Sequence, residues 1–315
     1  MKSPACLSLY KNLLRIISLA MLIFSVQGCS TVRLAYNQAP LAAYWYLDDY
    51  VDFSEEQKPA VKAALNELHQ WHRQTQLPAY IETLQKLQRQ MPEPLTPAKA
   101  CDFYQEVQER IMMSLEGAMR LDQTPAASFS LQKLAMLDRN QLLNMERKFA
   151  KSNVKYREDY LSGSPRQVAE KRLEQAVSRA ESIYGKLDER QQALLQTRLE
   201  QTGFDPELAY AERLRRQQDM LQALRSLASP GTSGSAVMTP ATAKTVAAGP
   251  ALEGVFTRAV ASPDSGYRAH SQRIRMHNCQ TFADLHNSTT PAQRQKALAK
   301  LQGYEQDLRA LLRHP

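Results

Sequence analysis

Histidines at short spacings are the side chains of this sequence best suited to hold a metal ion. His69 and His72 lie three residues apart with Trp71 between them, a spacing at which two imidazoles on one helix can bind Zn or Cu. The remaining histidines that invite the same interpretation are His270, His277 and His286. No third ligand accompanies the first pair, so we expect exposed polar histidines and no metal site.

Acidic side chains cluster in one place, at Asp48, Asp49 and Asp52. Paired carboxylates can exchange protons with a substrate, but a solvated helix face is the interpretation we prefer. No nucleophile elbow, metalloprotease helix, P-loop or lysozyme-like pair of carboxylates can be identified. We therefore predict that the protein is not an enzyme and has no catalytic residue and no cofactor.

Arginines gather in two segments that are candidates for binding phosphate or carboxylate groups, because guanidinium groups bind both bidentately. The first segment has Arg213, Arg215 and Arg216, and the second has Arg268, Arg273 and Arg275. The alternative is a solvated charged surface, which we take as the default. Anion binding by Arg213, Arg215, Arg216, Arg273 and Arg275 is our second functional hypothesis.

Residues 1–28 have the features of a secretory signal peptide. Lys2, Lys11 and Arg15 precede an apolar segment of about eleven residues, "IISLAMLIFSV", which is too short to span a bilayer. The following Val26-Gln27-Gly28-Cys29 resembles the bacterial lipobox, in which the chain is cut before the cysteine and the thiol carries diacylglycerol. The alternative is an ordinary cleavage site with an incidental cysteine.

The lipobox resemblance predicts where the protein is located. Lipidation of Cys29 would tie the chain to a membrane through several acyl chains. Ser30 stands where an aspartate would favour the inner membrane, so the sorting rule for such lipoproteins implies the periplasmic face of the outer membrane. We expect the membrane to be a partner through this N-terminal lipid.

The charge of the chain excludes little by itself. The formal charge is +8, and it falls to +5 when the basic residues of the signal peptide are removed. A pI near 9.3 is compatible with nucleic-acid binding, but the periplasm offers no nucleic acid to a tethered protein. We therefore expect no nucleic acid among the partners.

Two cysteines, Cys101 and Cys279, are left in the mature chain besides Cys29. Two thiols in an oxidising compartment suggest one disulfide, which we favour. The alternative is two separate buried thiols that behave as small hydrophobic groups.

Composition and capping motifs predict an all-α fold, either a multi-helix bundle or an array of helical hairpins. Five segments begin with a capping residue, and four of them carry Gln three positions later, which is the capping-box arrangement. The caps are Ser54, Thr96, Asp138, Asp188 and Thr290, and the glutamines are Gln57, Gln141, Gln191 and Gln293. We expect helices to begin near 54, 96, 138, 188 and 290, and others at about 40–52, 78–91, 165–186, 206–228 and 265–286.

The chain divides into a lipidated N-terminus with an aromatic first helix at 29–53, a helical domain at 54–228, and C-terminal helices at 265–315 that pack back onto it. Residues 229–264 are rich in Ser, Thr, Ala, Gly and Pro, and we expect a disordered insertion with a short turn of helix at 252–260. The aromatic residues of the first helix are Tyr36, Tyr44, Trp45, Tyr46, Tyr50 and Phe53. They lie either at lipid headgroups or against the core, and we favour the core.

Four segments resemble a family of Gram-negative lipoproteins known only as a domain of unknown function. They are "LAYNQAPLAAYWYLDDYVDFSEEQ", "WHRQTQLPAY", "AERLRRQQDMLQALRSL" and "ADLHNSTTPAQRQKALAKLQGYEQDL". The resemblance implies an outer-membrane lipoprotein and does not supply an activity. The cap Leu187-Asp-Glu-Arg-Gln191 is also similar to the LTxxQ motif of Spy-type periplasmic chaperones. We therefore expect a non-catalytic envelope component that binds proteins or acts like a chaperone.

Overall fold

The computed structural model describes residues 30–120, 137–228 and 251–313, and the fold is all-α, as predicted. Within these ranges there is no β-strand. None of the described helices is long and apolar enough to pass through a membrane. The helices are α2 (Thr31–Asn37), α3 (Ala39–Val51), α4 (Lys58–Thr75), α5 (Leu77–Gln90), α6 (Pro97–Arg120), α8 (Arg139–Tyr160), α9 (Pro165–Tyr184), α10 (Glu189–Glu200), α11 (Pro206–Ala228), α13 (Ser265–Ser288) and α14 (Pro291–Arg313).

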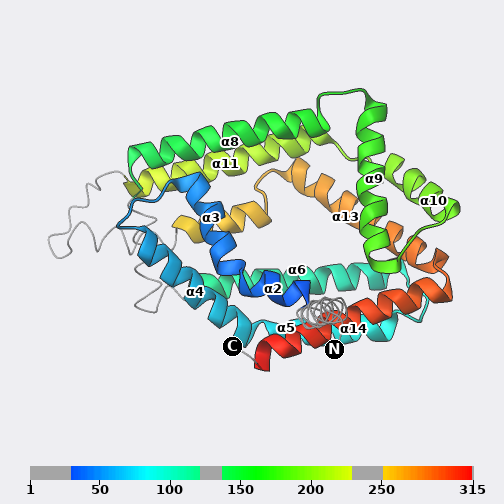
Figure 1. Cartoon of the computed structure of the whole chain (residues 1–315). Coiled ribbons are helices and arrows are strands. Elements are labelled where there is room, and N and C mark those ends of the chain that lie inside the picture. Colours follow the sequence, from blue (N-terminus) through cyan, green and yellow to red (C-terminus); the bar gives the residue numbers. More distant parts are fainter. Residues whose placement is uncertain (1–29, 121–136, 229–250, 314–315) are drawn as a thin grey trace, which may run out of the picture.

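The helices are arranged as an elongated frame (Figure 1). Helices α8 and α11 run along one long side, and α5, α6 and α14 run along the other. Helices α3 and α4 form one end, α9 and α10 form the opposite end, and α13 crosses between the sides. The last two helices pack back onto the earlier ones, since α13 contacts α6 and α14 contacts α5.

Capping boxes begin three helices at the positions that the sequence indicates. In α8 and α10 the Asp side chain accepts from the backbone N–H of the Gln three residues later, and that Gln side chain accepts from the cap N–H. Thr290 and Gln293 make the same pair of hydrogen bonds before α14, at 2.9 and 3.2 Å. At Thr96 the hydroxyl accepts from the Lys99 N–H.

The helix expected near 54 begins later, at Lys58. Residues 55–57 form a turn in which the Gln57 N–H donates to the Ser54 carbonyl at 2.9 Å. The cause is Pro59, which has no N–H and is tolerated only in the first turn of a helix. A helix that began at 55 would need that missing donor.

The capping glutamines also pair with one another across the fold. The Nε2 of Gln141 donates to the Oε1 of Gln57 at 2.6 Å. This hydrogen bond joins the N-terminus of α4 to the N-terminus of α8. Gln191 and Gln293 donate to each other at 2.8 and 2.9 Å and join the N-termini of α10 and α14. Buried amides need partners, and each of these pairs supplies them reciprocally.

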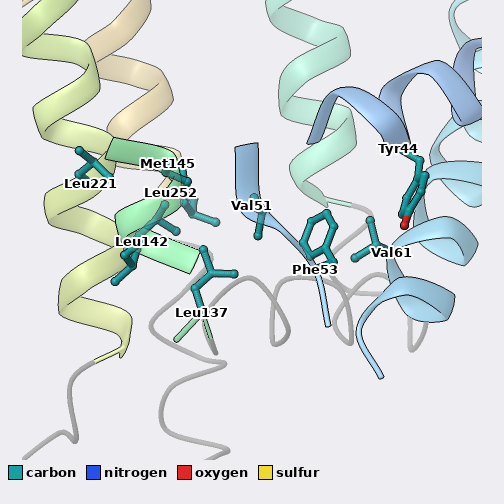
Figure 2. Close-up of a cluster of buried hydrophobic side chains, with 10 residues drawn as sticks. Tyr44, Val51, Phe53, Val61, Leu137, Leu142, Met145, Leu221 and Leu252 are labelled. Carbon is teal, nitrogen blue, oxygen red and sulfur yellow. The ribbon is translucent and has the colours of Figure 1, made fainter. Parts of the chain in front are cut away.

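Apolar residues directly before the caps are buried, as expected of hydrophobic staples. They are Phe53, Leu95, Leu137 and Leu187. Phe53 and Leu137 belong to the largest core cluster, where Figure 2 shows Phe53 between Val51 and Val61, and Leu137 next to Leu142. This cluster joins α3 and α4 to α8, α11 and the chain around Leu252.

Residues 251–260 form a helix, with Leu252 and Val255 buried. This corrects the expectation of a disordered insertion over 229–264 for its last part, while the helical turn expected at 252–260 is present. The apolar residues Leu252, Val255 and Phe256 give this segment an apolar face that packs against the core. The rest of the expected insertion, 229–250, lies outside the described residues, as do the predicted signal peptide, 1–28, and Cys29.

The sulfur atoms of Cys101 and Cys279 lie 2.10 Å apart as a disulfide. The bond links α6 to α13 across 178 positions of the sequence.

Candidate functional site

An apolar pocket of about 670 Å³ lies between α3, α8 and α11. Its volume is within the range of small-molecule and peptide-side-chain sites. The apolar and aromatic residues that line it are Tyr46, Leu47, Tyr50, Val51, Leu137, Met145, Phe149, Ala209, Met220, Leu224, Leu252, Phe256 and Tyr267. Four of them, Val51, Leu137, Met145 and Leu252, are labelled in Figure 2.

Helical spacing explains why these side chains meet. Met145 and Phe149 are four residues apart and lie on one face of α8. Met220 and Leu224 repeat that spacing on α11, and Leu47 and Val51 repeat it on α3. Three amphipathic faces therefore converge on one space, which the helix at 251–260 covers with Phe256.

Glu212 is the carboxylate of the pocket wall, and it is 4% exposed. Both of its oxygens accept hydrogen bonds, at 2.8 to 2.9 Å, from Arg215, Arg216 and the Ser262 hydroxyl. Burial by itself raises the pKa of Glu212, but these hydrogen bonds outweigh burial and lower its pKa to about 2. The Glu212 carboxylate therefore holds the two arginines in place and stays ionised at neutral pH.

Arg213 differs from its two neighbours because neutral groups hold it. Its Nε donates to the Asn153 Oδ1 and its Nη2 to the Ser152 Oγ, each at 2.8 Å. The guanidinium also lies over the ring of Tyr156, 5.5 Å from its centre. No described carboxylate forms an ion pair with Arg213, so the apolar pocket has one uncompensated cation in its wall.

The arginines predicted as an anion site do not all line the pocket. Arg215 is bound to Glu212 and also to Asp219, at 3.4 Å. Arg216 contacts Glu212 and the ring of Tyr267. On α13, Arg273 is exposed and Arg275 is half-buried, and Arg268 donates to the Ser262 carbonyl. Of the predicted set, Arg213 and Arg216 are the ones that line the pocket.

His69 and His72 are half-buried, so the expectation that they are exposed is wrong. They line a smaller apolar pocket of about 380 Å³, to which α2, α3, α4, α5 and α6 all contribute residues. Tyrosine hydroxyls contact both ring nitrogens of His72, with Tyr36 at 2.9 Å and Tyr80 at 3.2 Å. The Nε2 of His69 has no hydrogen-bond partner among the described residues. Burial lowers the pKa of both histidines.

The other candidate histidines hold helices together. His286 is fully buried between the Tyr184 hydroxyl and the Glu93 carbonyl, both at 2.9 Å. His270 is also buried, and its ring accepts from the Asp205 N–H. His277 contacts the Arg198 carbonyl at 2.6 Å. Their exposure was expected from the sequence, but His270 and His286 are buried and His277 is half-buried, each with a polar partner from another segment. Across the described residues, no three His, Cys, Asp or Glu side chains gather as metal ligands.

The acidic cluster of α3 has structural roles. The Asp48 carboxylate accepts from the Phe53 N–H at 3.0 Å. Asp49 forms an ion pair with Lys148 of α8. Asp52 ends the helix in a left-handed conformation, with φ of 60°.

Sequence reasoning did not identify the pocket itself. Its signal was present in part, since Tyr46 and Tyr50 stood out as aromatic residues and 252–260 as a helical turn. The missing information was tertiary, because nothing local says that α3, α8 and α11 converge.

Comparison with known proteins gives a family for this chain. The model of a family of unknown function (DUF6279) matches residues 49–233, more than half of the sequence. Neither the curated proteins nor the solved structures include a match.

Proposed function

The chain belongs to the DUF6279 family of unknown function, and we propose that it is an outer-membrane lipoprotein, acylated at Cys29, that binds an apolar segment of an envelope protein. Binding takes place in the pocket between α3, α8 and α11, and no reaction is catalysed.

The observation that carries the binding proposal is the lining of the pocket. Leucine, methionine, phenylalanine and tyrosine side chains from separate helices surround a space of about 670 Å³. Phe149 and Met220 pack against the core cluster there, and both remain half-buried. Concave apolar surfaces of this kind accept apolar side chains of a partner, because burial of apolar area drives association.

The state of Glu212 supports a non-catalytic role. An acid or base that works near neutral pH needs a pKa near 7, and Glu212 has a pKa of about 2 with its oxygens engaged. The likeness of Leu187–Gln191 to the motif of Spy-type chaperones remains a prediction of chaperone-like action.

A second candidate ligand follows from Arg213. An apolar pocket with one uncompensated cation is suited to an amphipathic anion, such as a lipid with a phosphate or carboxylate group. This version of the anion hypothesis differs from the one based on the sequence, because a single arginine of the predicted set binds the anion in place of a cluster.

Photo-crosslinking from within the pocket tests the proposal. A benzophenone side chain replaces Phe149, which lines the pocket, or Leu143, which is exposed on the same helix and serves as the control. We expect irradiated cells to give a protein adduct from position 149 and not from position 143. A lipid adduct, recognised by its mass, supports the second candidate. Equal adducts from both positions, or none from 149, would contradict binding in the pocket.

A further inference from the structure

The first helices of the described chain have an exposed surface that is unusually poor in polar groups. Leu34 is 58% exposed, Leu41 49% and Trp45 60%. Between Arg33 and Asp48 no residue carries a charge, and residues 39–47, "APLAAYWYL", contain no charged or amide side chain at all. A helix on the surface of a soluble domain normally presents charged residues to water.

Helix α3 packs against the core with a different face. Tyr44 is 2% exposed and packs in the main cluster with Val51 and Leu47. Leu41 and Trp45, four residues apart, share a different face and point away from that cluster. A helix that is apolar on its outward face as well as its inward face is suited to contact with apolar groups outside the domain. The aromatic cluster, which we expected against the core, is therefore divided between core and surface.

Trp45 is the member of this surface that indicates a lipid environment. Tryptophan is enriched at membrane–water interfaces because its ring is large and apolar and its indole N–H is polar. Leu34 and Leu41 lie between it and the start of the described chain at Ser30, which directly follows Cys29. Fourteen residues of helix separate Thr31 from Trp45, and they extend for at most about 21 Å.

We infer that the outward surface formed by Leu34, Leu41 and Trp45 lies in the headgroup region of the phospholipid leaflet that holds the acyl chains of Cys29. The inference rests on the lipoprotein part of the proposed function. The occupant follows from the position of Cys29 in the sequence, because acyl chains attached there would hold Leu34, five residues later, close to lipid. Helix α3 has 13 residues, against about 20 for a span, so the contact is with the surface of the membrane.

The acidic residues at the end of α3 do not oppose this contact. Asp49 is neutralised by the ion pair with Lys148. Asp48 is engaged by the Phe53 N–H, and Asp52 lies beyond the apolar stretch at the turn to α4. Repulsion between these carboxylates and anionic lipids is therefore confined to the end of the helix farthest from Cys29.

Tryptophan fluorescence of the full-length lipidated protein tests the inference. The chain has two tryptophans, so the variant Trp71→Phe reports Trp45 and the variant Trp45→Phe reports Trp71. Each is reconstituted into phosphatidylethanolamine–phosphatidylglycerol vesicles with or without brominated acyl chains. We expect brominated lipid to quench Trp45 at least twofold more than Trp71, and vesicles to protect Trp45 from iodide in the water.

The outcomes distinguish this surface from the anchor. If the protein floats with the vesicles while iodide quenches Trp45 and brominated lipid does not, the surface inference is overturned and the anchor stands. If the protein does not float, the lipoprotein proposal fails first. Leu41→Glu should reduce quenching by brominated lipid, whereas Leu143→Glu, at a similarly exposed leucine of α8, should leave it unchanged. Protection of Trp45 that depends on protein concentration in the absence of lipid would show a second copy on this surface and contradict the inference.

Discussion

Gln191 and Gln293 donate to each other through their side-chain amides across the meeting point of α10 and α14. Each amide also donates to a backbone carbonyl, Gln191 to Ser288 at 3.0 Å and Gln293 to Lys186 at 2.9 Å. Each glutamine caps its own helix as well. One pair of side chains thus supplies hydrogen-bond partners to the backbone at two helix termini and in the segments that precede them.

The substitution Gln293→Ala should therefore be costly. It removes one cap and leaves the buried amide of Gln191 without its partner, so we expect a loss of about 3 kcal/mol in the free energy of unfolding. Urea denaturation measures the loss. Gln196→Ala, which removes an exposed contact with Glu200, should cost only about 0.3 kcal/mol and is the control. Equal effects of the two substitutions would show that the buried pair does not stabilise the fold.

Stability should fall in acid because of Glu212. Its pKa is about 2 in the folded state, against an ordinary value of 4.5 in the unfolded chain, so its contribution is complete above pH 4.5 and is lost as the pH falls towards 2. The shift corresponds to a contribution on the order of 3 kcal/mol at neutral pH. Glu212→Gln should lower stability at pH 7 and flatten its decline between pH 4.5 and 2. Parallel pH profiles for variant and parent, measured by urea denaturation, would contradict this assignment.

Loss of the Cys101–Cys279 disulfide should destabilise the protein by about 4 kcal/mol, because the bond closes a loop of 178 positions in the unfolded chain. The double variant Cys101→Ala/Cys279→Ala and the parent treated with dithiothreitol should unfold at the same urea concentration, below that of the oxidised parent. Thiol labelling of the denatured parent, isolated without a reductant, checks the premise. Two reactive thiols would mean that the cysteines are separate.

Arg213→Gln separates the two candidate ligands of the pocket. An apolar protein segment depends on burial, so the yield of protein adduct from a benzophenone at position 149 should stay within about twofold of the parent. Binding of an anionic lipid depends on the guanidinium, so the yield of lipid adduct from position 149 should fall about tenfold. Arg273→Gln, on an exposed arginine outside the pocket, is the control. A tenfold loss confined to Arg213→Gln would reject the protein segment in favour of the lipid.

Local features of the fold could be predicted from the sequence, because a helix cap depends on residues within one turn. Asp138 with Gln141 and Asp188 with Gln191 are recognisable from spacing alone, and the structure has both boxes. The error at Ser54 is also local, since Pro59 five residues later already restricts where the helix begins. That the same glutamines pair between helices could not be predicted, because no short pattern records which termini meet.

The candidate site depends on tertiary contacts in the same way. Spacing placed Arg213, Arg215 and Arg216 together, but only the structure shows that Glu212 engages two of them and leaves the third to neutral groups. His286 looked like a surface histidine because nothing near it in sequence reveals the Tyr184 hydroxyl, 102 residues away. Burial of polar side chains is decided by such distant partners.

Both the membrane surface and the choice of partner depend on lipidation of Cys29, which mass spectrometry of the N-terminal peptide of the mature protein detects. We predict that this peptide begins at Cys29, with diacylglycerol on the thiol and an acyl chain on the amine. A mature chain that begins elsewhere, or an unmodified Cys29, would contradict it.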